Sequence, residues 1–472
     1  LDAGASIDRR TKKGTHVLQI AIKTKKGEQD GTDMFRYLLS RMPPGTDLGF
    51  AKKFIQEHAE DKRQKQNVMK YWAKRAEAIK PPNEEEMQIW KKRGIERLLE
   101  LQMLMIGNDE AVREITNAIK VFRMTWETRK GKPLVIALPG SSGVGKTMSA
   151  KKVAELLGDD DAYLQIPCGS HDIHKILGHS NMYKGDGFGM VPRFLHTRQN
   201  KWTVIVFDEL EKIQGWDTKG FLHALYQLID EGTIHDQSNT LKEEISARQC
   251  IFIFTTNVGE KEVLAELKKQ DRKTLKERRK NINKAASKAF KKWLHNVTGS
   301  HAFWGRVAKC VSFAPYTRNE LELLIDDRVR RYLVYYSMAP EAKQEKLIGG
   351  LDITVHPSIT KHMMTEADLS LGYRSVEEMV LKYVETPVLE SFSDIKDANT
   401  DEKKNATAWL GLEDSSPQIF LSEEDLNGAM KKQGAEEESV EKNRKEEEEW
   451  RSDSKVSTSI PSTHPVSLGE AL

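Results

Sequence analysis

Short, largely apolar runs that end in glycine or polar residues recur along the middle of this chain and predict buried strands. Four of them lie at residues 135–138, 162–167, 204–207 and 250–257. The first run stops at Pro139 and Gly140, and residues 148–157, after the next loop, have the apolar spacing of a helix. The pattern therefore predicts a strand that passes through a glycine-rich loop directly into a helix.

On either side of this region the pattern is helical and highly charged. Residues 48–98 are interrupted only at Pro81 and Pro82, and we interpret them as a solvated linker of helices. Thr317 and Glu320 have the spacing of a capping box, which predicts the start of a helical domain with short strands at 408–412 and 418–421. From residue 422 the chain is polar and rich in glutamate, serine and threonine, which predicts disorder.

Composition limits the cellular setting and the classes of partner. The 472 residues include 38% hydrophobic and 31% charged residues, enough for a core beneath a charged surface and for two to four domains. The three cysteines lack metal-binding spacing and are too few for a disulfide framework, so we expect an intracellular protein, in the mitochondrion or the cytoplasm. No apolar run reaches about 20 residues, so no membrane partner is expected. The chain begins with Leu1, inside a recognisable unit, and we expect a fragment or a processed chain.

The loop after the first strand carries the strongest chemical signal. Residues 140–147 fit the pattern G-x-x-x-x-G-K-[ST] between a predicted strand and a predicted helix. The glycines let backbone N–H groups surround a phosphate chain, Lys146 adds a charge at the β- and γ-phosphates, and Thr147 offers a hydroxyl to Mg²⁺. The predicted cofactors are therefore ATP and Mg²⁺, held by Gly140, Ser141, Ser142, Gly143, Val144, Gly145, Lys146, Thr147 and Met148.

Paired acids follow the strand at 204–207. Asp208 at the strand's carboxyl end can hold Mg²⁺ through water, and Glu209 is free to polarise the attacking water as a general base. A pair of acids is common by itself. An apolar strand that ends in F-D-E-x-E-K, downstream of a phosphate loop, is a much more specific signal.

The segment Met105-Ile-Gly-Asn-Asp-Glu-Ala-Val112, together with the phosphate loop and the acid pair, resembles the AAA+ ATPases of the Clp unfoldase and disaggregase class. The resemblance spans residues 101–421. It implies an α/β fold in which a parallel sheet is flanked by helices, followed by a mainly helical small domain. It also implies that the segment around Ile106 lines the adenine pocket.

The same resemblance assigns three further residues. Asn257 matches the first sensor, which holds the attacking water, and Arg374, in Leu371-Gly-Tyr-Arg374, matches the second sensor. Arg306 matches the arginine finger, which acts at the site of a neighbouring subunit and so implies an oligomer. Gly305 and Ala308 replace the family's asparagine and aspartate beside it.

Residues 175–195 lie where Clp-type proteins carry their axial pore loop. Tyr183, Lys184 and Gly185 match the family's Y-V-G, although the preceding double proline is missing and Lys184 replaces an apolar residue. The resemblance implies that Tyr183 grips a polypeptide. The alternative is that Tyr183 is an ordinary tyrosine on a surface loop without contact to a substrate.

Residues 1–39 resemble an ankyrin repeat, with Asp2-Ala-Gly-Ala5, Lys13-Gly-Thr15 and two short helices in that order. The central pattern departs from the usual T-P-L-H-x-A, and residues 24–31 resemble a small insertion. An ordinary helical hairpin is the alternative. One such repeat cannot bury its own face, so further repeats are expected before Leu1.

We predict five regions: an ankyrin-like repeat (1–45), a charged helical linker (46–100), the AAA+ large domain (101–316), the small domain (317–421) and a disordered tail (422–472). The expected function is ATP-driven threading of unfolded or aggregated protein through the pore of a homohexamer. The alternative is a regulatory or scaffolding nucleotide switch, to which the ankyrin-like segment recruits a protein partner. A nucleic-acid motor ranks third: residues 268–292 hold twelve lysines and arginines against two acids but few aromatics, which favours a solvated or subunit-facing helix.

Overall fold

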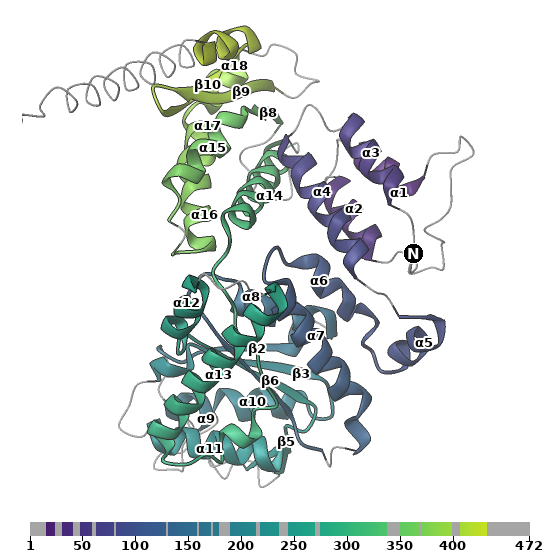
Figure 1. The fold of residues 1–472 in the computed structure, drawn as a ribbon, viewed down its shortest axis with the longest axis vertical. Coiled ribbons are helices and arrows are strands. Elements are labelled where there is room, and N and C mark those ends of the chain that lie inside the picture. Colours follow the sequence, from purple (N-terminus) through teal and green to yellow (C-terminus); the bar gives the residue numbers. More distant parts are fainter. Residues whose placement is uncertain are drawn as a thin grey trace, which may run out of the picture.

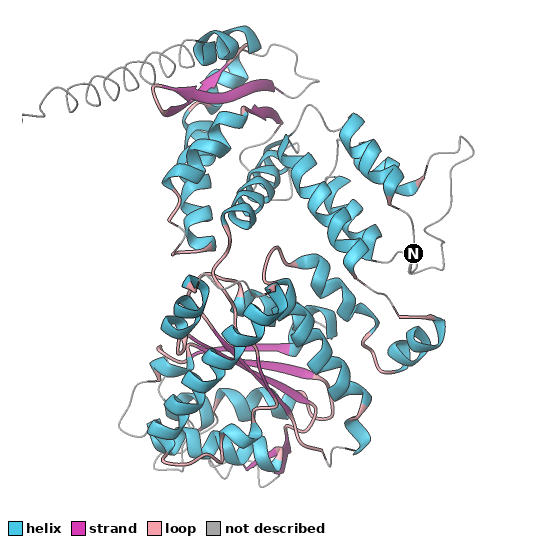
Figure 2. Ribbon diagram, viewed as in Figure 1, coloured by secondary structure: helices cyan, strands magenta, loops and turns pink. Residues whose placement is uncertain are grey.

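The computed structural model describes residues 16–23, 31–40, 48–58, 63–79, 82–128, 131–157, 160–170, 173–178, 189–213, 218–235, 244–269, 274–337, 350–368, 370–398 and 406–431. Figure 1 shows the arrangement of these elements, with a sheet-containing domain in the lower half and two groups of helices above it. The same division is visible when the chain is coloured by secondary structure (Figure 2).

A parallel five-stranded sheet forms the centre of the lower domain. Its order is β2-β3-β6-β1-β7, so the strand that precedes the phosphate loop is enclosed by neighbours on both sides. All four predicted strands are confirmed, with ends shifted by one or two residues. They are β1 (Leu134–Pro139), β2 (Tyr163–Pro167), β3 (Thr203–Asp208) and β6 (Cys250–Thr256). The fifth strand of the sheet is β7 (Lys309–Cys310).

Alternate residues of these strands enter two different cores, because successive side chains point to opposite faces of a sheet. Ile136 and Leu138 pack with helices α6 to α8, whereas Val135 and Ala137 pack with α10, α11 and α13. A sheet buried on both faces explains why its strands are almost continuously apolar. The helices of this domain are α5 (Glu84–Lys92), α6 (Glu100–Leu104), α7 (Asp109–Met124), α8 (Lys146–Leu157), α9 (Ile173–Leu177), α10 (Met190–Thr197), α11 (Thr218–Glu231), α12 (Glu260–Lys268) and α13 (Leu275–Thr298).

The basic segment forms most of α13, which is amphipathic. Ile282, Ala286, Phe290 and Leu294 are buried in the domain. The lysines between them, such as Lys284 and Lys288, are exposed. The helix thus covers the domain with one face and presents its charges to solvent with the other. A small hairpin of β4 (Thr233–His235) and β5 (Glu244–Ser246) completes the lower domain.

The C-terminal domain is mainly helical and carries a three-stranded sheet of order β10-β9-β8. The predicted capping box is present, since Glu320 N–H donates to Thr317 Oγ1 over 3.3 Å and Thr317 N–H donates to Glu320 Oε2 over 2.7 Å. Its elements are α14 (Arg318–Ser337), β8 (Leu351–Val355), α15 (Pro357–Glu366), α16 (Tyr373–Val380), α17 (Thr386–Glu390), α18 (Phe392–Asp397), β9 (Ala406–Glu413) and β10 (Ser416–Phe420).

The tail does not become irregular at residue 422 as predicted. Residues 423–431 are helical, and Leu426 is only 4% exposed because it packs against Gly411 of β9. The rest of the predicted disordered tail, residues 432–472, lies outside the described residues.

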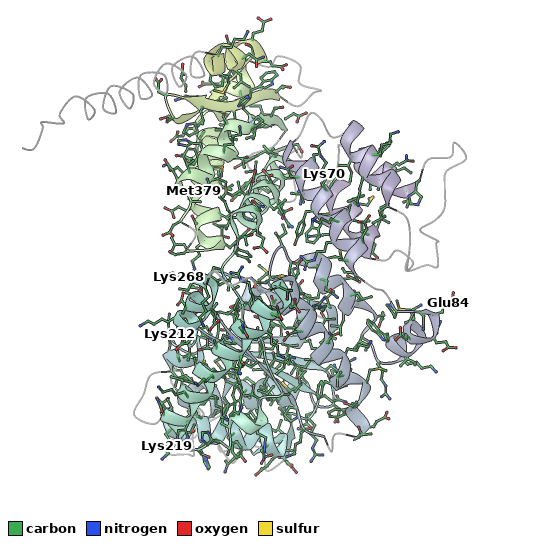
Figure 3. The ribbon with its side chains drawn as sticks, in the orientation of Figure 1. Lys70, Glu84, Lys212, Lys219, Lys268 and Met379 are labelled. Carbon is green, nitrogen blue, oxygen red and sulfur yellow. The ribbon has the colours of Figure 1, made fainter. Side chains whose placement is uncertain are left out.

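Among the described residues, four helices precede residue 80: α1 (Val17–Lys23), α2 (Gly31–Ser40), α3 (Gly49–His58) and α4 (Arg63–Ala78). Of these, α3 and α4 lie in the predicted linker and are not the solvated connector that its charge suggested. Phe35, Ile55 and Trp72 share one buried cluster with Ile325 and Val329 of α14. Figure 3 shows Lys70 of α4 in the half of the molecule that holds α14 to α17, whereas Lys212 and Lys219 lie in the half with the sheet.

Helices α1 and α2 pack on each other, as an ankyrin-like helix pair would. Residues 1–15 and 24–30, which carry most of the ankyrin-like pattern, lie outside the described residues. The ankyrin assignment therefore stays a prediction.

Candidate active site

The phosphate loop lies at the carboxyl edge of the parallel sheet, directly after β1. The strand register places Pro139 beside Thr256 and Pro167 beside Asp208, so the carboxyl ends of four strands, two of them polar, meet at this edge. At Gly140, where φ is +151°, an added Cβ would lie 2.3 Å from the backbone oxygen of Phe313. Only glycine fits there, and the loop can turn closely over the strand ends.

Lys146 begins α8 and points inward beneath the loop. Its Nζ donates to Asn257 Oδ1 over 2.8 Å, to Ser141 O and Thr256 O over 3.0 Å each, and to Gly140 O. Burial lowers the pKa of Lys146 to about 8, against the opposing pull of Glu211 and other nearby carboxylates. The loop therefore holds its lysine ready by hydrogen bonds that a phosphate oxygen can replace.

Thr147 and Asp208 meet on the other side of the site. Thr147 Oγ1 donates to Asp208 Oδ1 over 2.8 Å. Gln165 Nε2 donates to Asp208 Oδ2 over 2.9 Å, and Thr255 Oγ1 also donates to Oδ1. These partners fix the carboxylate beside the threonine hydroxyl. Both are hard oxygen donors of the kind that Mg²⁺ prefers.

The described residues contain no group of three or more histidines, cysteines or acids that could hold a metal ion by themselves. Together, Thr147 and Asp208 fit a Mg²⁺ ion that takes its remaining ligands from phosphate and water, as Mg²⁺ does in nucleotide sites.

Glu209 has a backbone conformation that is rare for a residue with a side chain. Its φ and ψ are both 55°, in the left-handed region. Such a conformation is costly and clusters at functional sites. The hydroxyl of Thr255 accepts from Glu209 N–H over 2.9 Å, and Lys212 Nζ lies 2.9 Å from Glu209 Oε1. Glu209 thus follows Asp208 in a strained turn, with its backbone held by Thr255 and its carboxylate paired with Lys212.

Asn257 follows β6 and contacts both sides of the site. Its amide oxygen accepts from Lys146, and its backbone N–H donates to Glu211 Oε1 over 3.0 Å. The structure thus brings together Lys146, Thr147, Asp208, Glu209 and Asn257, the central predicted residues of the large domain. Glu211, Gln165 and Thr255 were not singled out from the sequence, although Glu211 belongs to the F-D-E-x-E-K pattern and Thr255 to the polar strand end.

Arg306 lies apart from this cluster and is held by its own chain. Its Nε and Nη2 contact the two carboxylate oxygens of Asp230 at 2.6 and 2.9 Å, and Nη2 also lies 3.3 Å from Tyr226 OH. Lys132 Nζ reaches Asp230 Oδ1 over 2.6 Å. Hydrogen bonds from Arg306 and then Lys132 hold the pKa of Asp230 well below its usual value. Sequence analysis did not identify these partners.

The second-sensor segment closes over the phosphate loop from the small domain. Tyr373 N–H donates to Gly143 O over 2.9 Å. An added Cβ at Gly143, where φ is +72°, would lie 2.2 Å from Leu371 O. Arg374, the next residue, is exposed at the start of α16, and Met148 is 50% exposed on α8. The small domain therefore reaches the phosphate loop through backbone contacts, with Arg374 beside them.

The predicted adenine segment lies on the flank of the loop. Ile106 is 6% exposed, and Asn108 Nδ2 donates to Ala314 O over 3.0 Å and to Val144 O over 3.4 Å.

The predicted pore-loop residues Tyr183, Lys184 and Gly185 lie outside the described residues, between α9 and α10.

Comparison with known proteins agrees with this geometry. Residues 132–296, which include the phosphate loop, the acid pair and Asn257, match the family model described as "AAA domain (Cdc48 subfamily)". The chaperone protein ClpB of Aquifex aeolicus is 26% identical over 318 residues, 64% of this chain and 28% of that protein. The chain carries an AAA+ ATPase domain of the Clp type. The predicted family resemblance is thereby confirmed, and this family implies nucleotide binding.

Two further matches are similar to this chain in sequence or in fold. Heat shock protein hsp98 of Neurospora crassa is 28% identical over 235 residues, 48% of this chain and 23% of that protein. A solved structure titled "Closed State CryoEM Reconstruction of Hsp104:ATPyS and FITC casein" superposes with a TM-score of 0.52 at 19% identity, over 75% of this chain and 56% of that one. The structural match supports the AAA+ fold. The chain spans about a quarter of the length of these curated relatives.

Proposed function

We propose that the chain works as an ATP-driven protein unfoldase or disaggregase that assembles into a homohexamer and threads unfolded or aggregated polypeptide through its central pore. The observation that carries the proposal is that five predicted residues of the nucleotide site, Lys146, Thr147, Asp208, Glu209 and Asn257, meet at one sheet edge. Lys146 contacts Asn257, and Thr147 contacts Asp208, directly beneath the phosphate loop. Relatives named chaperone protein ClpB share this domain.

In the proposed reaction a water molecule attacks the γ-phosphorus, and the bond to the β-phosphate oxygen breaks to release ADP. Glu209 takes the water's proton as general base, and Asn257 orients the water. Lys146 neutralises charge on the β- and γ-phosphates, and the backbone N–H groups of residues 140–145 cradle the phosphate chain. Thr147 and Asp208 would hold Mg²⁺, which supplies charge stabilisation when bound.

Two arginines that lie apart from the cluster at the sheet edge would complete the proposed site. Arg306 would reach the γ-phosphate of a neighbouring subunit. Arg374 would approach the phosphates from the small domain, where the backbone of Tyr373 already contacts the phosphate loop. Each of these two roles depends on how domains or subunits close around the nucleotide.

The second candidate is a regulatory or scaffolding AAA+ nucleotide switch. One observation favours it: α1 to α4 share a buried cluster with α14, so a protein bound to the N-terminal helices could bias the small domain. A nucleic-acid motor has no comparable support, because the apolar face of α13 is used by the domain itself.

Tyr183 separates the motor from the switch. An aromatic side chain can grip polypeptides of any sequence by its large apolar face. Tyr183→Ala should keep basal ATPase and assembly and abolish unfolding of a stable model protein per ATP hydrolysed, whereas Tyr183→Phe should keep unfolding. If the parent unfolds nothing, or if Tyr183→Ala unfolds as well as the parent, the threading proposal fails.

A further inference from the structure

Helix α4 contacts the proposed adenine segment, Met105–Asp109, through two of its side chains. Tyr71 OH accepts from Gly107 N–H over 3.1 Å and lies 3.4 Å from Asp109 Oδ1. Arg75 Nη1 lies 2.8 Å from Asp109 Oδ1 and also donates to Met105 O. Two residues one helical turn apart thus bind three of the five residues of this segment.

The other side of the same segment rests on the phosphate loop. Asn108 Nδ2 donates to Val144 O, and a Cβ added at Gly145 would lie 3.2 Å from Met105 Cε. A Cβ added at Gly107, where φ is +73°, would lie 2.9 Å from the ring of Tyr316. The segment is therefore packed between α4 and the phosphate loop, and a shift of α4 would also move the segment.

The two α4 side chains, Arg75 buried and Tyr71 half-buried, are polar groups with defined partners. Only 5% of the Arg75 side chain is exposed. Burial raises the pKa of Tyr71 to about 12, so at neutral pH the phenol keeps its proton and can donate to Asp109 while it accepts from Gly107. The guanidinium lies 5.7 Å from the ring centroids of both Tyr71 and Trp72. Buried polar groups with this many partners orient the backbone they bind.

We propose that Tyr71 and Arg75 are positioning residues of the nucleotide site, which set the affinity for the base-carrying part of an adenine nucleotide by fixing the Met105–Asp109 backbone. This inference rests on the proposed role of that segment in binding the base. It assigns part of the nucleotide site to the N-terminal helices, outside the domain that carries the phosphate loop.

Helix α4 also contacts the small domain, which gives this arrangement a wider consequence. Asn67 Nδ2 donates to Asp326 Oδ2 of α14 over 2.9 Å, and Trp72 is buried with residues of that helix. One helix therefore contacts both the base segment and the small domain. Nucleotide binding and the placement of the N-terminal helices must then affect each other, because linkage is reciprocal.

The test compares a ligand with a base to one without. ADP and tripolyphosphate compete against a fluorescent ATP analogue on the full chain, and each dissociation constant is measured. Tyr71→Phe removes only the hydroxyl and should weaken ADP binding about fivefold, the size of the one hydrogen bond lost to the segment's backbone at Gly107, while tripolyphosphate binding changes less than twofold. Arg75→Met should weaken ADP tenfold or more with the same selectivity.

Tyr332→Phe is the matched control. Its hydroxyl lies on α14, where it accepts from Arg328 over 3.5 Å, and it should leave both affinities unchanged. If the parent binds neither ligand, the proposed function itself fails. If the parent binds both, and Tyr71→Phe changes neither affinity or weakens both equally, the inference is overturned. Should Arg75→Met fail to fold, Tyr71→Phe alone decides.

Discussion

Asp230 holds the guanidinium of Arg306 in a two-point contact within the same chain, with Nε and Nη2 at 2.6 and 2.9 Å from the two carboxylate oxygens. Such paired geometry fixes the plane of a guanidinium as well as its position. Nη1 makes no hydrogen bond to the residues that the structure describes, so it remains available to a phosphate across a subunit interface. Asp230 would then orient the proposed arginine finger.

Asp230→Asn should lower kcat for ATP hydrolysis about 10- to 100-fold and leave the dissociation constant for ATP unchanged. The amide keeps the size of the side chain and loses the charge and the paired contact, so Arg306 samples other orientations. Single-turnover hydrolysis and equilibrium binding separate the two quantities. A kcat that rises instead would show that Asp230 sequesters Arg306.

Arg306→Ala should lower hydrolysis by about 10³-fold while nucleotide binding persists, as for other arginine fingers. In assemblies mixed with Glu209→Gln subunits, some interfaces combine an intact Arg306 with an intact Glu209, so part of the activity should return. Light scattering confirms that the mixtures assemble. Absence of activity at every mixing ratio of assembled subunits would contradict action in trans.

Glu209→Gln should bind ATP with nearly parental affinity and hydrolyse it about 10² to 10⁴ times more slowly, because the general base is lost. The backbone contact from Glu209 N–H to Thr255 does not involve the side chain and should survive. Lys146→Ala is the contrasting variant and should not bind ATP. Full turnover by Glu209→Gln would remove Glu209 from the mechanism.

Nucleotide affinity should fall as pH rises through the pKa of Lys146, which burial lowers to about 8. Bound phosphates favour the charged ammonium, so binding takes up a proton above this pH. The dissociation constant for ADP should therefore be about tenfold larger at pH 9 than at pH 7. Lys146→Met should bind weakly and without this pH dependence. If the dissociation constant of Lys146→Met depended on pH as strongly as that of the parent, another group would be responsible for the pH dependence.

Trp72→Ala should destabilise the chain by about 3–5 kcal/mol, the usual cost of emptying a large buried aromatic site. Trp72 is 1% exposed in the cluster that joins α4 to α14. Urea unfolding followed by circular dichroism measures the change. Val121→Ala, at a position 55% exposed, is the control and should stay within about 0.5 kcal/mol. A negligible effect at Trp72 would show that α4 does not stabilise the small domain.

The sequence by itself determined the nucleotide site of the large domain, because the residues of that site lie in short stretches that each carry a recognisable pattern. A strand, a glycine loop and a helix start lie within residues 134–147, and an acid pair at 208–209 follows the buried strand at 204–207. Parallel strands bring their carboxyl ends to one edge, so the meeting of Thr147 with Asp208 and of Lys146 with Asn257 follows from the strand pattern once the strands pair. Each of these residues was predicted.

The tertiary structure decided the contacts between elements that are far apart in sequence. Nothing near Arg306 indicates that Asp230, 76 positions earlier, binds it. The charge of residues 46–100 suggested a solvated linker, because its lysines and glutamates dominate the composition. Only the packing shows that Val68 and Trp72 are buried against α14 and that Tyr71 and Arg75 bind the Met105–Asp109 backbone. Such contacts depend on which helix faces meet, and a single sequence carries no signal for that choice.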